Sequence, residues 1–340
     1  MRKSLVVAGG LLILIVLAMS FAPASVEGQA GYKAPKTPWG EPDFQGIWTT
    51  NEMHGVPNTR PAGTSATISE ADALARRQKT TAGTVGAEGI GNYDEAFRDT
   101  SARWTKQRIS TQASVIVDPP DGQMPPFTPQ ELERRKAGRG ARSATGDGAD
   151  VIGRARPADW TGFGAWGRCI TRGAPTIVPP SGYNNGVQIV QGPGYVAIQK
   201  EMIHETRVVA TNGGPQLSSK VTTWSGNGRG RWDGDTLVVE ITNIDPRAGG
   251  LSGASPSAKL TERFTRRGPN ELEYLFIVDD PNVWTRPWTG RMTMSLDQAQ
   301  YELVEYACHE ANYSMINSLS AARAEEQAER GAAAKKPASR

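Results

Sequence analysis

The stretch that decides the fold is Gly228-Arg-Gly-Arg-Trp-Asp-Gly-Asp-Thr-Leu-Val-Val-Glu-Ile-Thr-Asn-Ile-Asp245. It contains the turn signal Asp233-Gly234, followed by apolar residues at every second position from Leu237 to Ile241. Alternation of this kind after a tight turn predicts a strand with one buried face. Similar runs lie on both sides, and the segments between them are too short for crossover helices. Residues 183–310 therefore predict an antiparallel sheet or barrel.

The clearest predicted hairpin joins Lys259–Arg266 to Glu271–Asp279 through a Gly-Pro-Asn turn. Further strands are predicted at residues 43–50, 113–118, 187–191, 195–203, 204–211, 221–224, 236–242, 284–296 and 301–309. One open sheet of about eight to ten short strands would leave long edges exposed. We therefore expect a mainly β fold, an antiparallel meander that closes into a barrel or a strongly rolled sheet.

Short helices are expected in the N-terminal region and one at the C-terminus. Ser69 is a suitable N-cap for a helix that reaches Lys79, with acids early and bases late. A second helix is predicted near residues 94–105, and a third begins at Thr128, which is followed by Pro and a capping-box Glu. Residues 315–330 have a helical pattern, followed by a tail that should fray.

The first residues predict export. Arg2 and Lys3 precede an apolar run from Leu5 to Met19, and Ala22-Pro-Ala24 offers a small-x-small cleavage site. The alternative is an uncleaved membrane anchor, because residues 5–22 approach the ~20 residues that cross a bilayer. We expect a cleaved signal peptide at residues 1–24 and a periplasmic or secreted protein, with membrane contact only if cleavage fails.

Composition divides the rest of the chain. Residues 25–135 form an extended and helical region expected to pack on the β domain, and residues 136–156 form a flexible Gly-, Ala- and Arg-rich loop. The β domain covers residues 157–311, and residues 312–340 form the C-terminal helix and tail. The net charge of +3 is small and its basic residues are dispersed, so nucleic acid is not an expected partner. The oligomeric state has no signal in the sequence.

Two cysteines, Cys169 and Cys308, flank the predicted strands. An exported chain reaches an oxidising compartment, where such a pair becomes a disulfide. Two free thiols or a thiolate metal site are the alternatives. A bridge here would tie the last predicted strand back to the start of the β domain.

Several segments resemble those of a family of uncharacterised exported bacterial β-rich proteins. They include Pro42-Asp-Phe-Gln-Gly-Ile-Trp48, Gly230-Arg-Trp-Asp-Gly-Asp-Thr-Leu-Val-Val-Glu240 and Glu305-Tyr-Ala-Cys-His-Glu-Ala-Asn-Tyr313. This resemblance covers most of the mature chain, implies export and implies no chemistry. Separately, Gly46-x-Trp48 is similar to the Gly-x-Trp that opens a lipocalin-like (calycin) barrel.

The sequence contains no nucleophile elbow, phosphate loop, dinucleotide fingerprint or His-Glu-x-x-His motif. It therefore lacks the motifs by which the commonest enzyme classes are recognised. The candidates for chemistry are His204, His309 and Glu305. On strands, Glu305 shares a face with His309, and the two imidazoles plus this carboxylate would supply the three ligands of a catalytic divalent metal. The alternative is that both histidines are hydrogen-bonded residues at a barrel end.

A ligand pocket is the other candidate site. Charged residues in strand segments need partners if they face inward, and aromatic walls with a few polar anchors are typical of small-molecule sites. The candidate ligand-binding residues are Trp232, Glu240, Arg263, Tyr274 and Trp288. The leading hypothesis is an exported barrel-like protein that binds a small, partly apolar molecule. A metal-assisted or acid-base enzyme is the second hypothesis, and an envelope structural or interaction protein is the third.

Overall fold

The computed structural model describes residues 32–85, 108–138, 159–175, 177–180, 184–248, 255–296, 302–310 and 312–334. The described residues from Ala34 onward belong to one compact unit. The predicted signal peptide, the predicted helix at 94–105 and residues 139–156 of the predicted loop lie outside the described residues. Within the described part, no helix has both the length and the apolar character of a membrane span.

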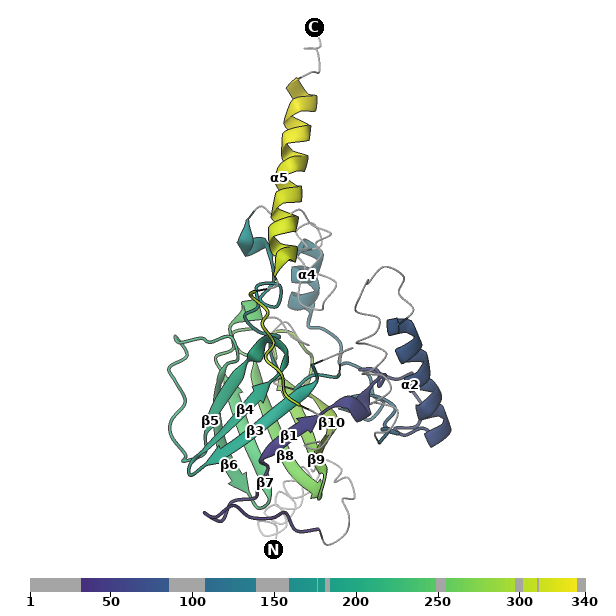
Figure 1. Cartoon of the computed structure of the whole chain (residues 1–340), viewed down its shortest axis with the longest axis vertical. Coiled ribbons are helices and arrows are strands. Elements are labelled where there is room, and N and C mark those ends of the chain that lie inside the picture. The colour runs from purple at the N-terminus through teal and green to yellow at the C-terminus, as the bar shows by residue number, and fades with distance from the viewer. Residues whose placement is uncertain are drawn as a thin grey trace, which may run out of the picture. The chain divides into compact units, whose positions relative to one another are not determined.

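Nine strands form a closed ring, which confirms the mainly β barrel (Figure 1). Their order is β1-β3-β4-β5-β6-β7-β8-β9-β10, and β10 pairs with β1. The short β2 pairs with the start of β10, whereas β1 pairs with its end. The strands are β1 (Gly46–Thr49), β2 (Ile116–Asp118), β3 (Gly186–Gly192), β4 (Tyr195–Lys200), β5 (Thr206–Ala210), β6 (Asn227–Asp233), β7 (Thr236–Thr242), β8 (Lys259–Gly268), β9 (Glu271–Asp279) and β10 (Trp288–Leu296).

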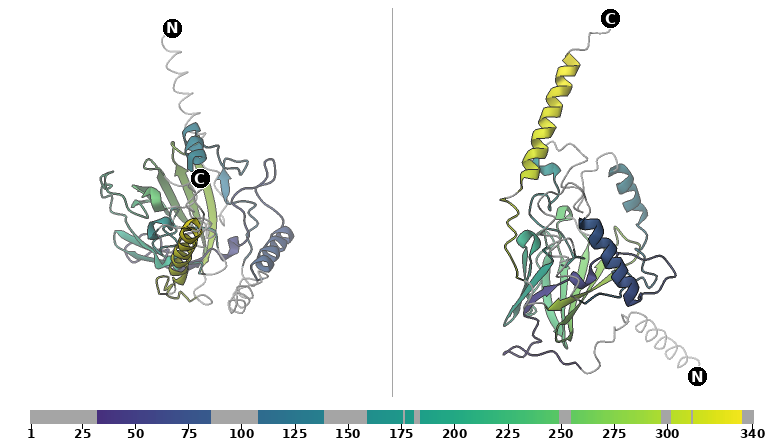
Figure 2. Two further views of the ribbon diagram at one scale, coloured as in Figure 1. Left: turned by 90° about the horizontal axis from the view of Figure 1, so that it is seen from above. Right: turned by 45° about the vertical axis from the view of Figure 1, so that its right-hand side comes forward.

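Among the described residues, three α-helices lie outside the ring: α2 (Glu70–Val85), α4 (Pro129–Gly138) and α5 (Tyr313–Ala334) (Figure 2). The hydroxyl of Ser69 accepts from the amide of Asp72, and the hydroxyl of Thr128 accepts from the amide of Glu131. Both predicted N-caps are therefore confirmed, because each side chain satisfies a backbone donor that the helix leaves free. Short 3₁₀ turns are η1 (Asn51–Met53), η3 (Trp160–Gly162), η4 (Met202–His204) and η5 (Pro246–Ala248).

The quoted stretch forms the hairpin of β6 and β7. Asp233 pairs with Thr236 across a two-residue turn, and Gly234 has φ +58°, which favours glycine. Leu237, Val239 and Ile241 are all buried in the core. In the neighbouring hairpin, the alternate residues of β9 from Leu272 to Val278 are likewise buried. Period-two alternation therefore gave the correct inward face in both hairpins.

The ring is closed by a strand from the N-terminal region. In β1, Trp48 pairs with Val187 of β3 on one side and with Leu296 of β10 on the other. Its side chain is completely buried, and the indole N–H donates to the carbonyl of Phe44 at 2.8 Å. Residues 25–135 thus supply two strands of the sheet in addition to the helices that lie outside it.

The ring has one weak seam, between β5 and β6. These strands are parallel and meet at a single bridge, Ala210 with Arg229, whereas the other ring pairings are antiparallel. Val209 of β5 packs against β6 where two glycines leave room: a Cβ on Gly230 would lie 2.9 Å from Val209, and one on Gly228 3.8 Å. Side-chain packing replaces backbone pairing along this part of the wall.

Two predicted strands are wrong. Residues 221–224 contribute only an isolated bridge, between Thr223 and Ile244. Residues 302–310 contain no strand. The physical reason is that β10 already pairs with β9 on one edge and with β1 and β2 on the other, so no edge remains for another strand.

The disulfide between Cys169 and Cys308 is confirmed, with Cα atoms 5.8 Å apart. It holds residues 302–310, which lack regular structure, against the segment that precedes β3. Beside it, the side-chain amide of Asn312 donates to the carbonyl of Gly167 at 2.8 Å. The bridge therefore fixes the chain between β10 and α5 without adding a strand.

The interior of the ring is filled by side chains. The largest buried ones that pack there are Trp48, Phe264, Tyr274, Phe276, Trp288, Met292 and Met294. Phe276 and Trp288 meet edge to face with ring centroids 5.7 Å apart, a favoured aromatic geometry. The packed interior therefore leaves room for cavities only at the ends of the ring and at its seam.

Candidate functional site: a buried charged cluster at the barrel seam

No described hydrogen bond or ion pair joins the predicted catalytic residues to one another. His204 is exposed at the end of η4, where Ile203 and His204 have φ of 69° and 57°, so the expected strand begins only at Thr206. His309 and Glu305 are exposed on the segment that carries no strand. In the described part of the chain, no three His, Cys, Asp or Glu residues form a group that could hold a metal ion.

The five predicted ligand residues are divided between the two faces of the wall. Tyr274 and Trp288 point into the filled interior and are 0% and 1% exposed. Glu240 lies outside, paired with Arg231, and Arg263 is partly exposed and contacts Asp233. Trp232 packs on Phe44 with ring centroids 5.4 Å apart. None of the five lines either of the two cavities described below.

A buried ion pair joins β5 to β8 inside the ring. Arg207 of β5 donates to one oxygen of Glu262 on β8, and the hydroxyl of Tyr274 donates to the other at 2.6 Å. The side chains of Arg207 and Glu262 are 6% and 0% exposed. Burial, and then the nearby Glu262 carboxylate, raise the pKa of Tyr274 well above its usual range, so its hydroxyl keeps its proton and donates.

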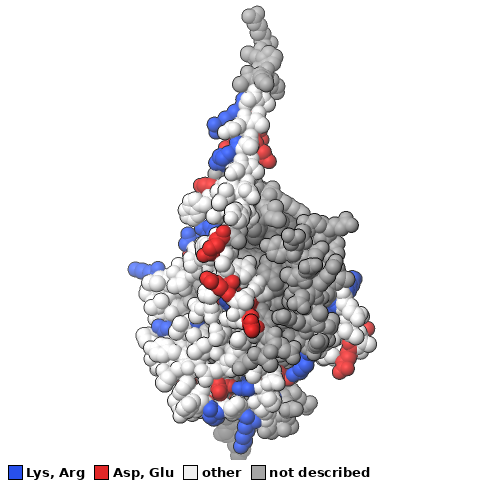
Figure 3. All heavy atoms as spheres, viewed as in Figure 1, with Lys and Arg blue, Asp and Glu red and all other residues white. Residues whose placement is uncertain are grey.

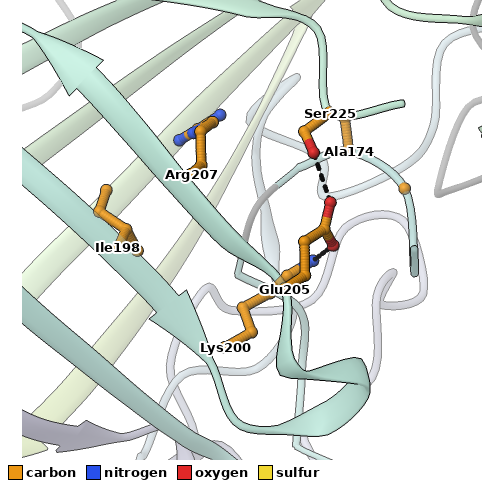
Figure 4. A pocket seen from close by; sticks show the side chains of 7 residues that line it. Ala174, Ile198, Lys200, Glu205, Arg207 and Ser225 are labelled. Atoms are coloured by element: carbon orange, nitrogen blue, oxygen red, sulfur yellow. Dashed lines mark hydrogen bonds and ion pairs between the residues drawn. The ribbon is translucent and has the colours of Figure 1, made fainter. Parts of the chain in front are cut away.

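A second buried ion pair lies beside it, at the seam. The ammonium of Lys200 is 2.7 Å from Oε2 of Glu205 (Figure 4). The hydroxyls of Thr171 and Ser225 also donate to this carboxylate. Glu205 comes just before β5 and Ser225 just before β6, so their hydrogen bond links the two strands where backbone pairing is missing.

The two partners respond differently to burial. Burial alone would raise the pKa of Glu205, but Lys200, Ser225 and Thr171 together bring that pKa below its usual value. Burial lowers the pKa of Lys200, and the opposing attraction of Glu205 does not fully offset it. Arg172 and Arg207 lower the pKa of Lys200 further. The carboxylate is therefore held ionised, while the ammonium is made a stronger acid than a surface lysine.

Lys200 lines two small cavities. The first has about 10 Å³ of space for the centre of a water molecule and is lined by Gly173, Ala174, Ile198, Lys200, Glu205, Arg207 and Ser225 (Figure 4). The second has about 30 Å³ and is lined by Thr50, Arg172, Ile177, Val178, Asn184, Asn185, Gly186, Val187, Lys200 and Met202. The first has room for one water and the second for about two. Charged groups and apolar walls thus surround two spaces that both border Lys200.

The sequence held a signal for half of this cluster. In β5, Arg207 shares a face with the buried Val209, and in β8 Glu262 shares a face with the buried Leu260 and Phe264. Period-two alternation alone therefore turns both charges inward. Lys200 and Glu205 had no such signal, because the left-handed residues of η4 stand between them.

The third histidine, His54, lies in a separate buried polar region beside η1. It is 4% exposed, and burial, followed by the charge of Arg77, lowers its pKa to about 4. Glu52 is also buried, and burial raises its pKa despite a hydrogen bond from Ser295. Asn51 links this region to the second cavity by accepting from Asn185 at 2.9 Å.

On the face shown in Figure 3, acidic and basic side chains are interspersed among uncharged residues.

Comparisons of the chain with protein-family models, with curated proteins and with solved structures found no match.

Proposed function

We propose that this chain is an exported barrel protein that binds a small, partly apolar molecule at the end of the ring where Lys200 lies. The observation that carries the proposal is the pair of cavities that Lys200 lines. Ligand sites combine apolar walls with a few placed polar groups. The second cavity has both kinds, with Ile177 and Val187 as walls and Thr50 and Asn185 as polar groups.

The cavity sizes set the kind of ligand. Spaces of about 10 and 30 Å³ admit a molecule, or one end of a molecule, of a few non-hydrogen atoms. The packed core leaves the aromatic interior as structural support for the ion pairs. We therefore place the ligand at the end of the barrel, away from Trp288.

Export and a lipocalin-like relationship belong to the same proposal. The disulfide fits an oxidising compartment, and the N-terminal sequence has the pattern of a secretory signal, so we propose a periplasmic or secreted protein. The closed ring with Trp48 on its closing strand supports a distant resemblance to calycin barrels. An enzyme that uses His204, His309 and Glu305 would need these residues at one point, and none of their described contacts favours it.

The test blocks the second cavity without touching the ion pairs. Val178 lines this cavity and is partly exposed, so Val178→Trp fills it from the mouth. Val190, on the outer face of β3 and 49% exposed, gives the matched control Val190→Trp. Native mass spectrometry of protein purified from its source should show a bound small molecule in wild type and in the control, and none in Val178→Trp. A bound mass that persists in Val178→Trp, or none in wild type, contradicts the proposal.

A further inference from the structure

We propose that Lys200 captures small carbonyl compounds as a protonated imine, in the cavities that it lines. The proposal rests on the proposed function, because the carbonyl compound is a ligand of the same cavities. It adds the chemical class of the ligand and a covalent step.

The geometry that carries the proposal is the position of the amine. Lys200 ends β4 and lines both cavities, yet its side chain is only 7% exposed. A small molecule in either cavity therefore lies against this side chain. Lys259, on the surface, lines neither of these cavities.

Glu205 is placed to accept the proton that Lys200 must lose. Its carboxylate is 2.7 Å from the ammonium and is held by the hydroxyls of Thr171 and Ser225. Burial, Arg172 and Arg207 lower the pKa of Lys200, which increases the fraction of free amine at neutral pH. Desolvation and neighbouring cations are the two means by which proteins activate lysine as a nucleophile.

The step balances without an oxidant or a reductant. The ammonium transfers one proton to Glu205, and the nitrogen lone pair attacks the carbonyl carbon, whose oxygen takes the proton back to give a carbinolamine. The carbon–oxygen bond then breaks, a second nitrogen proton leaves with the hydroxyl as water, and a protonated carbon–nitrogen double bond forms. Ammonium and aldehyde become iminium and water, so the product keeps one positive charge opposite Glu205 and the buried ion pair is preserved.

The cavities limit the carbonyl compound to a short aldehyde. The second cavity, walled by Ile177, Val187 and Met202, has room for about two non-hydrogen atoms, so it encloses the carbonyl end of the aldehyde. Propanal is therefore the probe of choice, and propan-1-ol is its unreactive analogue.

The experiment traps the imine in the full chain. The protein is incubated at pH 7 with propanal and sodium cyanoborohydride, which reduces an imine to a stable secondary amine, and the sites are read by peptide mass mapping. Lys259 and Lys220, both exposed, serve as internal comparators. A surface lysine is almost wholly protonated at this pH, so Lys200 should be labelled at least about tenfold faster. Labelling of Lys200 no faster than that of Lys259 overturns the proposal.

Two variants and the alcohol separate this proposal from the binding function. Val178→Trp should reduce the labelling of Lys200, because it blocks the second cavity, whereas Val190→Trp should not. If propan-1-ol raises the melting temperature of wild type but not of Val178→Trp, while Lys200 stays unlabelled, binding stands and the imine is refuted. If neither the alcohol binds nor Lys200 reacts, both proposals are refuted.

Discussion

Val209 occupies the space that a side chain on Gly230 would need: a Cβ there would lie 2.9 Å from Cγ1 of Val209 and 3.0 Å from Cγ2 of Thr211. This contact holds β5 against β6 where one bridge is their only backbone pairing. Gly230 is therefore part of the seam, and its lack of a side chain is a packing requirement, whereas a Cβ on Gly228 would only touch Val209 at 3.8 Å.

We expect Gly230→Ala to lower the free energy of unfolding by about 1–3 kcal/mol, because Val209 is stiff and the wall must move to admit the methyl group. Gly192→Ala is the control, since a Cβ at Gly192 meets nothing within 4 Å. Urea unfolding of both variants checks the prediction. Equal stability of the two would show that the seam tolerates expansion.

We expect Tyr274→Phe to lower the free energy of unfolding by about 1–3 kcal/mol. It removes the hydroxyl that donates to Oε1 of Glu262, and this fully buried oxygen is not exposed to solvent that could replace the hydrogen bond. Tyr195→Phe, at a site that is 50% exposed, should change stability by less than about 0.5 kcal/mol. Thermal unfolding of the two variants gives the comparison. A loss no larger than that of the control would mean that Arg207 alone satisfies Glu262.

Removing the disulfide should destabilise the chain by up to about 4–5 kcal/mol in the chain-entropy model, because Cys169 and Cys308 are 139 residues apart. The double Cys169→Ser, Cys308→Ser variant should match reduced wild type, and reductant should not affect it further. Unfolding with and without reductant checks this. The intact mass after thiol alkylation should show no alkylated cysteine in unreduced protein from an oxidising compartment.

Stability should fall between pH 6.5 and pH 4 through His54. Its pKa is lowered from 6.5 to about 4 in the folded protein, so folding disfavours the charged form. Its contribution is present above pH 6.5 and is lost as the pH falls to about 4, by about 2–3 kcal/mol. Glu52 acts in the opposite sense, because its raised pKa favours the folded state at low pH.

The two histidines give a matched pair for this test. His54→Gln should flatten the pH dependence of urea unfolding in that window, whatever its effect at pH 7, while His309→Gln should keep the slope because His309 is exposed. The exposed position also leads us to expect that His309→Gln changes stability by less than about 0.5 kcal/mol. A slope that survives in His54→Gln would assign the pH dependence to other groups.

Most strands of the sheet could be predicted from local sequence patterns. The hairpins β6–β7 and β8–β9 followed from turn residues and period-two alternation, since each pairs neighbouring segments. Ring closure was expected, but its partner was not, because nothing local to Gly46–Thr49 specifies that its neighbours are β3 and β10. The strand expected at 301–309 failed for the same reason: its alternation was visible, but the lack of a free edge was not.

The site was harder to predict, because it depends on places where the regular pattern breaks. Alternation along β5 and β8 turns Arg207 and Glu262 inward, and that much was available. The pairing of Lys200 with Glu205 depends on a turn in which Ile203 and His204 adopt positive φ, values that β-branched and bulky residues rarely take. A period-two pattern ran through this turn and placed His204 on a strand.

Closure by β1 also determines the order in which the barrel can be completed. Hairpins from β6 to β10 bring together segments that are close in the chain, whereas the pairing of Trp48 with Leu296 joins the first strand of the ring to the last. Contacts of high sequence separation form slowly, because the chain between them must first be ordered. During synthesis, β1 emerges before β10 and cannot be enclosed until β10 follows. Until then β3 and β10 keep open edges that can pair with another chain, so the protein is most vulnerable to aggregation just before its first strand enters the ring.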